Sequence, residues 1–144
     1  MDRAKKAVTC FKEGFSCSQA ILSTYSPELG IDRETALKVS GSFGGGMAQM
    51  AETCGAVTGA FMVIGLKYGK TEAKDDKAKG KTYGLVKDFC TKFKARHKSI
   101  VCRELLGCDI STPEGMKYAK DNKLVDIVCP KYVRDAAEII EEIL

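Results

Sequence analysis

The chain has 144 residues, of which 44% are hydrophobic and 29% charged, and its net charge is +4. These values are typical of one globular domain and exclude intrinsic disorder and fibrous repeats. No stretch approaches the roughly 18 to 20 apolar residues of a membrane span, and the first twenty residues lack the apolar run of a signal peptide. We therefore expect a single cytosolic domain over residues 1–144.

Positive charge is concentrated between Lys70 and Arg103, where eleven Lys or Arg residues accompany four acidic residues. Such a region could attract nucleic acid, but it has no series of aromatic residues on which bases would stack. Lys74, Lys77 and Lys81 have the spacing of an ordinary solvated helix face. Nucleic-acid binding is therefore disfavoured.

Apolar residues recur at three- and four-residue spacing along most of the chain, which predicts an all-α fold. Only residues 123–129 alternate like a strand, and they are too few to build a sheet. We expect a bundle of about six or seven helices. Eight segments have a helical pattern, of which the one from Pro113 to Lys120 is weak: Asp2 to Lys12, Ser16 toward Tyr25, a short helix after Asp32, Gly55 to Leu66, about Thr71 to His97, a short one from Ile100 to Leu106, Pro113 to Lys120, and a final helix from Pro130.

The middle of the chain is rich in glycine. Residues from Gly55 to Leu66 are apolar apart from Thr58, which predicts a central helix that is buried all round. Small residues such as Gly59 would let a second helix approach closely. The preceding stretch from Gly41 to Gly46 matches neither phosphate-binding glycine motif, so a chain reversal or close packing is its expected use.

Seven cysteines are many for a cytosolic domain, and an odd number disfavours a secreted disulfide framework. Four of them fall at predicted helix beginnings, where backbone amides and the helix dipole favour the thiolate. The alternative is that they are buried as small hydrophobic residues. The four are Cys17 after the N-cap Ser16, Cys54 after Thr53, Cys102 in the first turn after Ser99, and Cys129 directly before Pro130.

The other candidate residues are weaker. Cys10 and Cys90 lie inside predicted helices and are expected in the core, and Cys108 follows a glycine typical of a helix end, which leaves its role open. His97 is the only histidine, and we expect it to be a favourable cation at a helix end rather than the partner of a nucleophilic cysteine. The chain contains no C-x-x-C motif.

Several stretches of the sequence carry a resemblance to a known family: Gly14-Phe-Ser-Cys-Ser-Gln-Ala20, Gly44-Gly-Gly-Met47, Glu52-Thr-Cys-Gly-Ala-Val-Thr-Gly59, Cys102-Arg-Glu-Leu-Leu-Gly107 and the Cys129 helix. They are similar to the small bacterial and archaeal proteins of the C_GCAxxG_C_C family, which is described as redox-active and named for four cysteines, including a CGAxxG motif. The resemblance covers nearly the whole chain. It implies that the family's cysteines are Cys17, Cys54, Cys102 and Cys129, the same four that the helix positions select.

Three functions compete at this point. The leading hypothesis is a small redox protein, a thiol–disulfide oxidoreductase or electron carrier, in which Cys54 and Cys17 are the favoured pair and the partner is a redox protein or a small thiol. The second is binding of zinc or an iron–sulfur cluster by Cys17, Cys54, Cys102 and Cys129. The third is a helical interaction module with inert cysteines. The sequence leaves the redox partner and a homodimeric state open.

Overall fold

The computed structural model describes residues 2–144, which form eight α-helices and two short 3-10 helices. The all-helical prediction is confirmed, with eight helices rather than six or seven. The single β-type contact in the described range is an isolated antiparallel bridge between Thr53 and Val101. The helices are α1 (Arg3–Lys12), α2 (Cys17–Tyr25), α3 (Arg33–Ser40), α4 (Gly55–Tyr68), α5 (Asp76–His97), α6 (Cys102–Leu106), α7 (Pro113–Asp121) and α8 (Leu124–Ile143), with 3-10 turns at Ser26–Leu29 and Gly41–Phe43.

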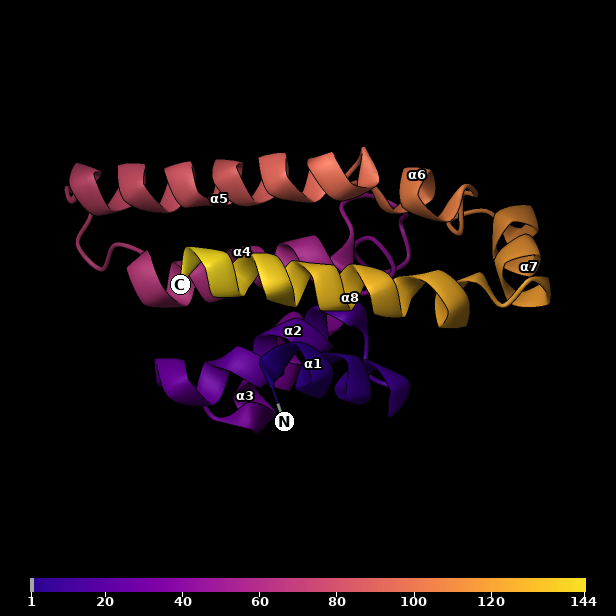
Figure 1. Cartoon of the computed structure of the whole chain (residues 1–144), viewed down its shortest axis with the longest axis horizontal. Helices are drawn as coiled ribbons and strands as arrows, with labels where there is room; N and C mark the ends of the chain where they lie inside the picture. The colour runs from indigo at the N-terminus through magenta and orange to yellow at the C-terminus, as the bar shows by residue number, and fades with distance from the viewer. Residues whose placement is uncertain (1) are drawn as a thin grey trace.

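The helices are arranged in three layers (Figure 1). The long helix α5 forms one layer, α4 and α8 form the middle layer, and α1, α2 and α3 form the layer on the other side. Helix α7 lies at one end of the bundle, next to the beginning of α8. This arrangement brings the first turns of α2, α4 and α6 to the same end of the molecule as the first turns of α8.

Helix α4 is the centre of the core. Its first six residues, 55–60, are all buried, and a Cβ atom at Gly59 would lie only 2.9 Å from the Cβ of Ile21 on α2. Real side chains do not approach that closely, so glycine permits the contact between α2 and α4 that the small-residue face predicts. The second half of α4 is less enclosed than predicted, because Phe61, Met62 and Leu66 are only partly buried.

Helix α5 begins at Asp76, later than the predicted Thr71, because the Asp75 side chain accepts a hydrogen bond from the amide of Ala78 at 3.0 Å and caps the helix there. Two of the predicted core residues of α5, Phe89 and Phe93, are fully buried and stack on each other. The ring centroids are 5.9 Å apart. The aromatic pair therefore anchors the α5 layer on the middle layer.

The predicted beginning of the last helix at Pro130 is wrong. Helix α8 begins at Leu124, so the segment that alternates like a strand is its first turn and a half. The reason is that Leu124, Val128 and Tyr132 follow one another at four-residue spacing and all pack on the core. Pro130 has no N–H to donate to the carbonyl of residue 126, but the packing of this apolar face outweighs the lost hydrogen bond.

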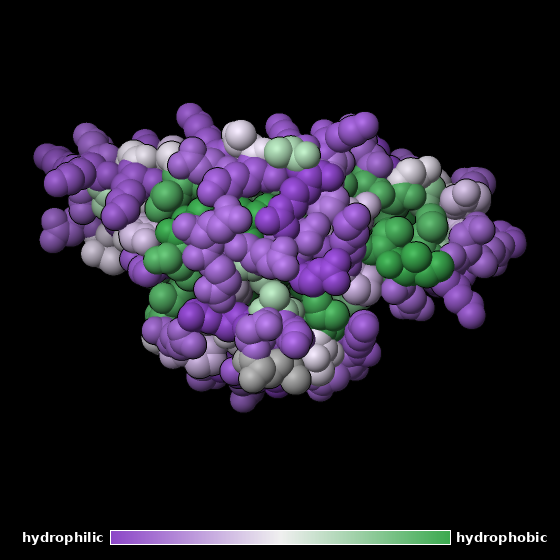
Figure 2. All heavy atoms as spheres, viewed as in Figure 1, coloured by the Kyte–Doolittle hydropathy of each residue, from purple (hydrophilic) through white to green (hydrophobic). Residues whose placement is uncertain are grey.

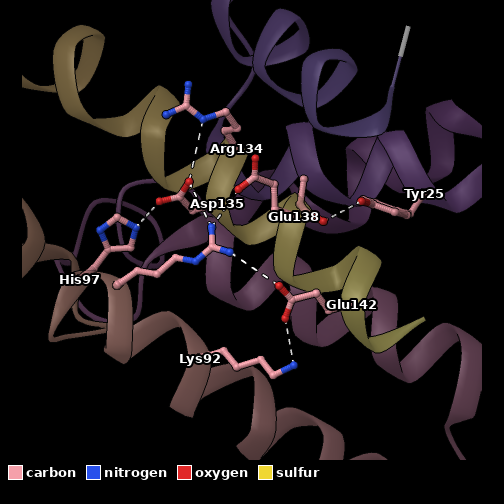
Figure 3. Close-up of polar contacts among 9 residues, drawn as sticks. Tyr25, Lys92, His97, Arg134, Asp135, Glu138 and Glu142 are labelled. Atoms are coloured by element: carbon pink, nitrogen blue, oxygen red, sulfur yellow. Dashed lines mark hydrogen bonds and ion pairs between the residues drawn. The ribbon is translucent and has the colours of Figure 1, made fainter.

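Charged side chains tie α8 to α5 along the surface (Figure 3). Lys92 pairs with Glu142 at 2.9 Å and Arg96 with Glu138 at 2.9 Å. Nearer the cysteines, the His97 Nε2 atom lies 2.8 Å from Asp135 Oδ2, and both side chains are largely buried. Exposed ion pairs contribute little free energy singly, so the buried pair is the main polar anchor of this face.

The visible surface is mostly hydrophilic, with hydrophobic residues grouped in two places, near α6, α7 and the beginning of α8 and, at the opposite end, near the ends of α4 and α8 (Figure 2). In the part of the chain that the structure describes, no helix combines the length and the apolar character needed to cross a bilayer.

Candidate active site: four cysteines around one cavity

Cys17, Cys54, Cys102 and Cys129 all line one cavity of about 1070 Å³ at the end of the bundle where α6, α7 and α8 meet. All four are buried, with between 5% and 8% of their surface exposed. The structure therefore brings together the four residues that the sequence singled out, although they are separated by tens of residues along the chain. Their chemical role stays a prediction.

Cys17 is the first residue of α2, as predicted. The predicted N-cap Ser16 forms a capping box with Gln19, in which the Gln19 backbone amide donates to the Ser16 hydroxyl and the Ser16 backbone amide donates to the Gln19 side chain. A Cβ atom at Gly55 would lie 3.2 Å from the Cβ of Cys17. The glycine that begins α4 thus lets the Cys17 side chain lie against that helix.

Cys54 and Cys102 are held together by the bridge between Thr53 and Val101. The amide of Cys54 donates to the carbonyl of Ile100 at 2.8 Å, and the amide of Cys102 donates to the carbonyl of Glu52 at 2.6 Å. Because side chains alternate along extended segments, residues on either side of the bridge point to the same face. This short antiparallel contact directs both cysteines into the cavity.

Cys54 is itself the N-cap of α4, whereas the sequence suggested Thr53 for that position. Cys102 is the first residue of α6, in agreement with the prediction. Cys129 departs from the predicted pattern, because it is the sixth residue of α8 and not a cap. Cys129 lines the cavity because its face of α8 is directed there. The stabilisation of a thiolate by the free amides of a helix beginning therefore does not apply to this residue.

One wall of the cavity is a left-handed segment that precedes α4. Gly45, Gly46, Met47, Ala48 and Gln49 all have φ between 53° and 71°, and Ala51 has φ 60°. A left-handed conformation costs roughly 1 to 2 kcal/mol for each residue that is not glycine. The segment is held in place because Arg103 donates to the carbonyl of Ala51 at 3.0 Å and pairs with Glu52 at 3.2 Å.

The left-handed segment and the glycine before it also pack directly on the cavity lining. A Cβ atom at Gly46 would lie 2.6 Å from the Cβ of Cys102, and one at Gly44 would lie 2.5 Å from the Cβ of Ser16. The glycines predicted for a chain reversal or close packing serve both purposes. Strained backbone next to a buried group of nucleophiles is typical of functional sites.

The acidities of the four thiols differ sharply. Burial raises the pKa of Cys54 to about 11, although the amides of Ala56 and Val57 act in the opposite direction. Burial, with added repulsion from Cys54 and Cys129, raises the pKa of Cys102 to about 12. The expectation that a helix beginning lowers the pKa is therefore wrong for these two residues, because desolvation outweighs the backbone amides.

Cys17 and Cys129 behave as a pair. The Cys17 thiol is a hydrogen-bond donor to Cys129, and this contact lowers the pKa of Cys129 below its usual value. Donation to Cys129, together with burial, raises the pKa of Cys17 well above its usual value. Two thiols that share one proton in this way give one thiolate at lower pH than an isolated cysteine does.

The remaining cysteines lie apart from the cavity lining. Cys10 is buried in α1, with its sulfur 3.6 Å from the Ser23 hydroxyl oxygen, in agreement with the predicted core position. Cys90 is only half-buried, so its predicted role in the core is at most partial. Cys108 is also half-buried and follows Gly107, which ends α6 in a left-handed conformation as expected.

His97 contacts no cysteine. It is the last residue of α5, as predicted, and it pairs with Asp135 in place of the free helix-end carbonyls (Figure 3). Its ring lies edge-on to Tyr132, with centroids 4.8 Å apart, and the Tyr132 hydroxyl donates to the carbonyl of Leu105 at 2.8 Å. Tyr132 lines the cavity, so His97 and Asp135 support one of its walls.

Zinc and iron–sulfur clusters need three or four ligand atoms directed at one point. Within residues 2–144, no three Cys, His, Asp or Glu side chains are arranged so that they could hold a metal ion. The four cysteines share a cavity without forming such a ligand set. The geometry therefore does not fit the second sequence hypothesis.

The fold and the site define a small helical protein with four thiols at one buried cavity. A family model described as "Putative redox-active protein (C_GCAxxG_C_C)" matches residues 15–143, so the chain belongs to this family. The family supports a redox role in general. The motif in the family's name places glycine before cysteine, whereas this chain has Cys54-Gly55-Ala56. No curated protein and no solved structure matches the chain.

Proposed function

We propose that this protein is a cytosolic thiol–disulfide redox protein whose working pair is Cys129 and Cys17. The observation that carries the proposal is that Cys17 and Cys129 line the same cavity, where interaction with the Cys17 thiol lowers the pKa of Cys129. The thiolate is the form that attacks disulfides, so Cys129 is the attacking residue and Cys17 the resolving residue. This assignment replaces the pair of Cys54 and Cys17 that the sequence favoured.

The reaction proceeds in two exchanges. The Cys129 thiolate attacks one sulfur of a substrate disulfide, the substrate S–S bond breaks, and one substrate thiolate leaves. Cys17 then loses its proton and attacks the Cys129 sulfur, which forms the Cys17–Cys129 disulfide and releases the second substrate thiolate. The protein loses two electrons and the substrate disulfide gains them. All seven cysteines are free thiols in this structure, which corresponds to the reduced starting state.

Cys54 and Cys102 have a different part in this proposal. Their high pKa keeps them protonated at neutral pH, so they do not compete as nucleophiles. They form the neutral wall of the cavity on the side of the left-handed segment. Free thiols in this number persist in a reducing compartment, which supports a cytosolic location for the proposal.

The test is to oxidise the reduced, metal-free protein with 2-hydroxyethyl disulfide and map its disulfides by mass spectrometry without reduction. We expect the Cys17–Cys129 disulfide as the main product. Cys17→Ser should stop the reaction at the mixed disulfide on Cys129, and Cys129→Ser should abolish it. Cys90→Ser is the matched control and should react like the unaltered protein. Protection of all four thiols in anaerobically purified protein, with bound metal or visible absorbance, would instead support the metal hypothesis.

A further inference from the structure

The mouth of the cavity carries unbalanced positive charge. Three exposed lysines line it, Lys12 from α1, Lys120 from α7 and Lys123 from the turn before α8, and Asp126 is the one acidic residue of the lining. None of the three lysines forms an ion pair with another residue in the range 2–144. A cleft lined by one sign of charge concentrates ligands of the opposite sign.

The two proposed reactive thiols have little exposed surface. Cys17 and Cys129 each keep only 8% of their surface exposed, and both line the cavity. Low exposure favours a small disulfide that enters the cavity over one fixed on the surface of a folded protein. The cavity volume of about 1070 Å³ accommodates a whole small molecule.

Apolar side chains also line the cavity. Phe11 and Phe15 come from the end of α1 and the turn after it, and Ile110 and Met116 come from the loop before α7 and from α7. These side chains would contact the carbon chain on either side of a disulfide bond, while the charged groups of the molecule stay near the lysines. The cavity thus combines cationic, apolar and nucleophilic side chains.

We propose that the substrate of the Cys129 and Cys17 pair is a small disulfide that carries negative charge, bound with its anionic groups at Lys12, Lys120 and Lys123. This inference rests on the proposed function and adds the class of substrate. Each exchange releases a substrate thiolate, which is a further negative charge. The three lysines therefore favour binding of the anionic substrate and stabilise the charge that develops on the leaving thiolate.

The experiment compares three disulfides that differ in charge: oxidised glutathione, which is anionic, 2-hydroxyethyl disulfide, which is neutral, and cystamine, which is cationic. The second-order rate constant for oxidation of the reduced protein is measured by rapid acid quench and mass spectrometry. The same three rate constants for the protein unfolded in denaturant report the intrinsic reactivity of each disulfide. For each disulfide, the rate constant of the folded protein divided by that of the unfolded protein gives the contribution of the folded cavity, which we call the normalised rate constant.

We expect the normalised rate constant to fall from the anionic to the neutral to the cationic disulfide. At low salt the anionic compound should exceed the cationic one by about tenfold or more, because electrostatic steering acts on encounter rates. At about 0.5 M salt most of this difference should disappear, because the screening length falls to a few ångströms.

The variant that tests the assignment is Lys12→Gln, Lys120→Gln, Lys123→Gln. It should lose most of the charge preference, measured as the ratio of the normalised rate constants for oxidised glutathione and cystamine. The matched control is Lys74→Gln, Lys77→Gln, Lys87→Gln, which removes the same charge from exposed positions outside the cavity lining. This control should keep the preference. Thermal unfolding of both variants checks that they remain folded.

Two results would overturn the inference while leaving the proposed function intact. One is a normalised rate constant for cystamine equal to or above that of oxidised glutathione, with the Cys17–Cys129 disulfide still formed. The other is faster oxidation by a folded disulfide protein, such as oxidised thioredoxin, than by any of the three small molecules. If no disulfide yields the Cys17–Cys129 product, the proposed function itself fails.

Discussion

The two pairs of thiols in the cavity show that position on a helix decides less than the immediate neighbours do. Cys54 and Cys102 both lie at helix beginnings, and burial raises the pKa of each. Cys129 lies inside a helix, and its pKa is lowered by a thiol donor. A single S–H group pointed at a sulfur therefore has more effect here than the amides of a helix end, because burial removes the solvent that supports the charge.

The largest expected effect of a single substitution is the loss of stability caused by Gly46→Ala, a substitution that disturbs the packing around Cys102. The new Cβ would lie 2.6 Å from the Cβ of Cys102, at a backbone φ of 71°. The left-handed backbone and the overpacking together should lower the free energy of unfolding by about 2 to 5 kcal/mol, measured by urea titration. Gly107→Ala is the matched control, because φ is 74° there and nothing lies within 4 Å. Equal losses for the two variants would contradict the packing of Gly46 on Cys102.

The second prediction concerns stability at alkaline pH. An ordinary thiol in the unfolded chain loses its proton near pH 9, whereas Cys54 in the folded protein has a pKa of about 11 and Cys102 of about 12. Above pH 9 the unfolded state therefore holds fewer protons, so the contribution of these thiols is complete below pH 9 and is lost as pH rises toward 11 and 12.

The expected loss of unfolding free energy by pH 11 is on the order of 5 kcal/mol. Chemical unfolding of the reduced protein at a series of pH values measures it. The double variant Cys54→Ala, Cys102→Ala should show a shallower decline. An identical pH dependence in the variant would mean that tyrosines and lysines, and not these thiols, cause the decline.

The third prediction sharpens the assignment of the reactive pair. Cys17→Ala removes the donor that lowers the pKa of Cys129. A hydrogen bond to a charged group contributes about 1.5 to 3 kcal/mol, so alkylation of Cys129 by iodoacetamide at neutral pH should slow by about 10- to 100-fold. Peptide mapping against time gives the rate at each cysteine.

Cys10→Ala is the control for the third prediction, because Cys10 is also buried but does not line the cavity. It should leave the rate at Cys129 almost unchanged. In the unaltered protein Cys129 should react before Cys54 and Cys102. Faster labelling of Cys54 than of Cys129 would mean that helix position prevails over the thiol donor after all.

The smallest effect is expected for Ala48→Gly in the left-handed segment. Ala48 is exposed and has φ 53°, so glycine relieves backbone strain without removing a buried contact. The free energy of unfolding should rise by up to about 1 kcal/mol. Ala73→Gly, at an exposed position without positive φ, should lower it slightly. A loss of stability in both variants would argue against strain at residue 48.

Local sequence patterns were sufficient for most helices. The capping box at Ser16 and Gln19, the cap at Asp32 and the left-handed glycine at Gly107 each act within a few residues, so their structures follow from short-range chemistry. Local patterns gave the wrong beginning for α8, because Pro130 is typical of the first residue of a helix. Packing of Leu124 and Val128 on the core decided that boundary, and no local pattern contains that information.

The left-handed segment and the cavity lining had weaker signals in the sequence. Glycines at 44–46 indicated a reversal, but Met47, Ala48 and Gln49 gave no sign of positive φ, because their conformation is imposed by contacts with α6. Tyr132 and the three lysines come from separate elements and have no shared motif. The one further sequence signal for a closely packed wall at this position was the run of small residues before α4.

The sequence by itself determined that this protein is helical and that α4 is its central helix, and it singled out the four cysteines that line one cavity, because periodicity, capping and the family motif are local properties of the chain. Only the tertiary structure decided which thiol is acidic. That property depends on desolvation and on the donor that Cys17 presents to Cys129 from 112 residues away in the chain, and both arise only when the helices pack.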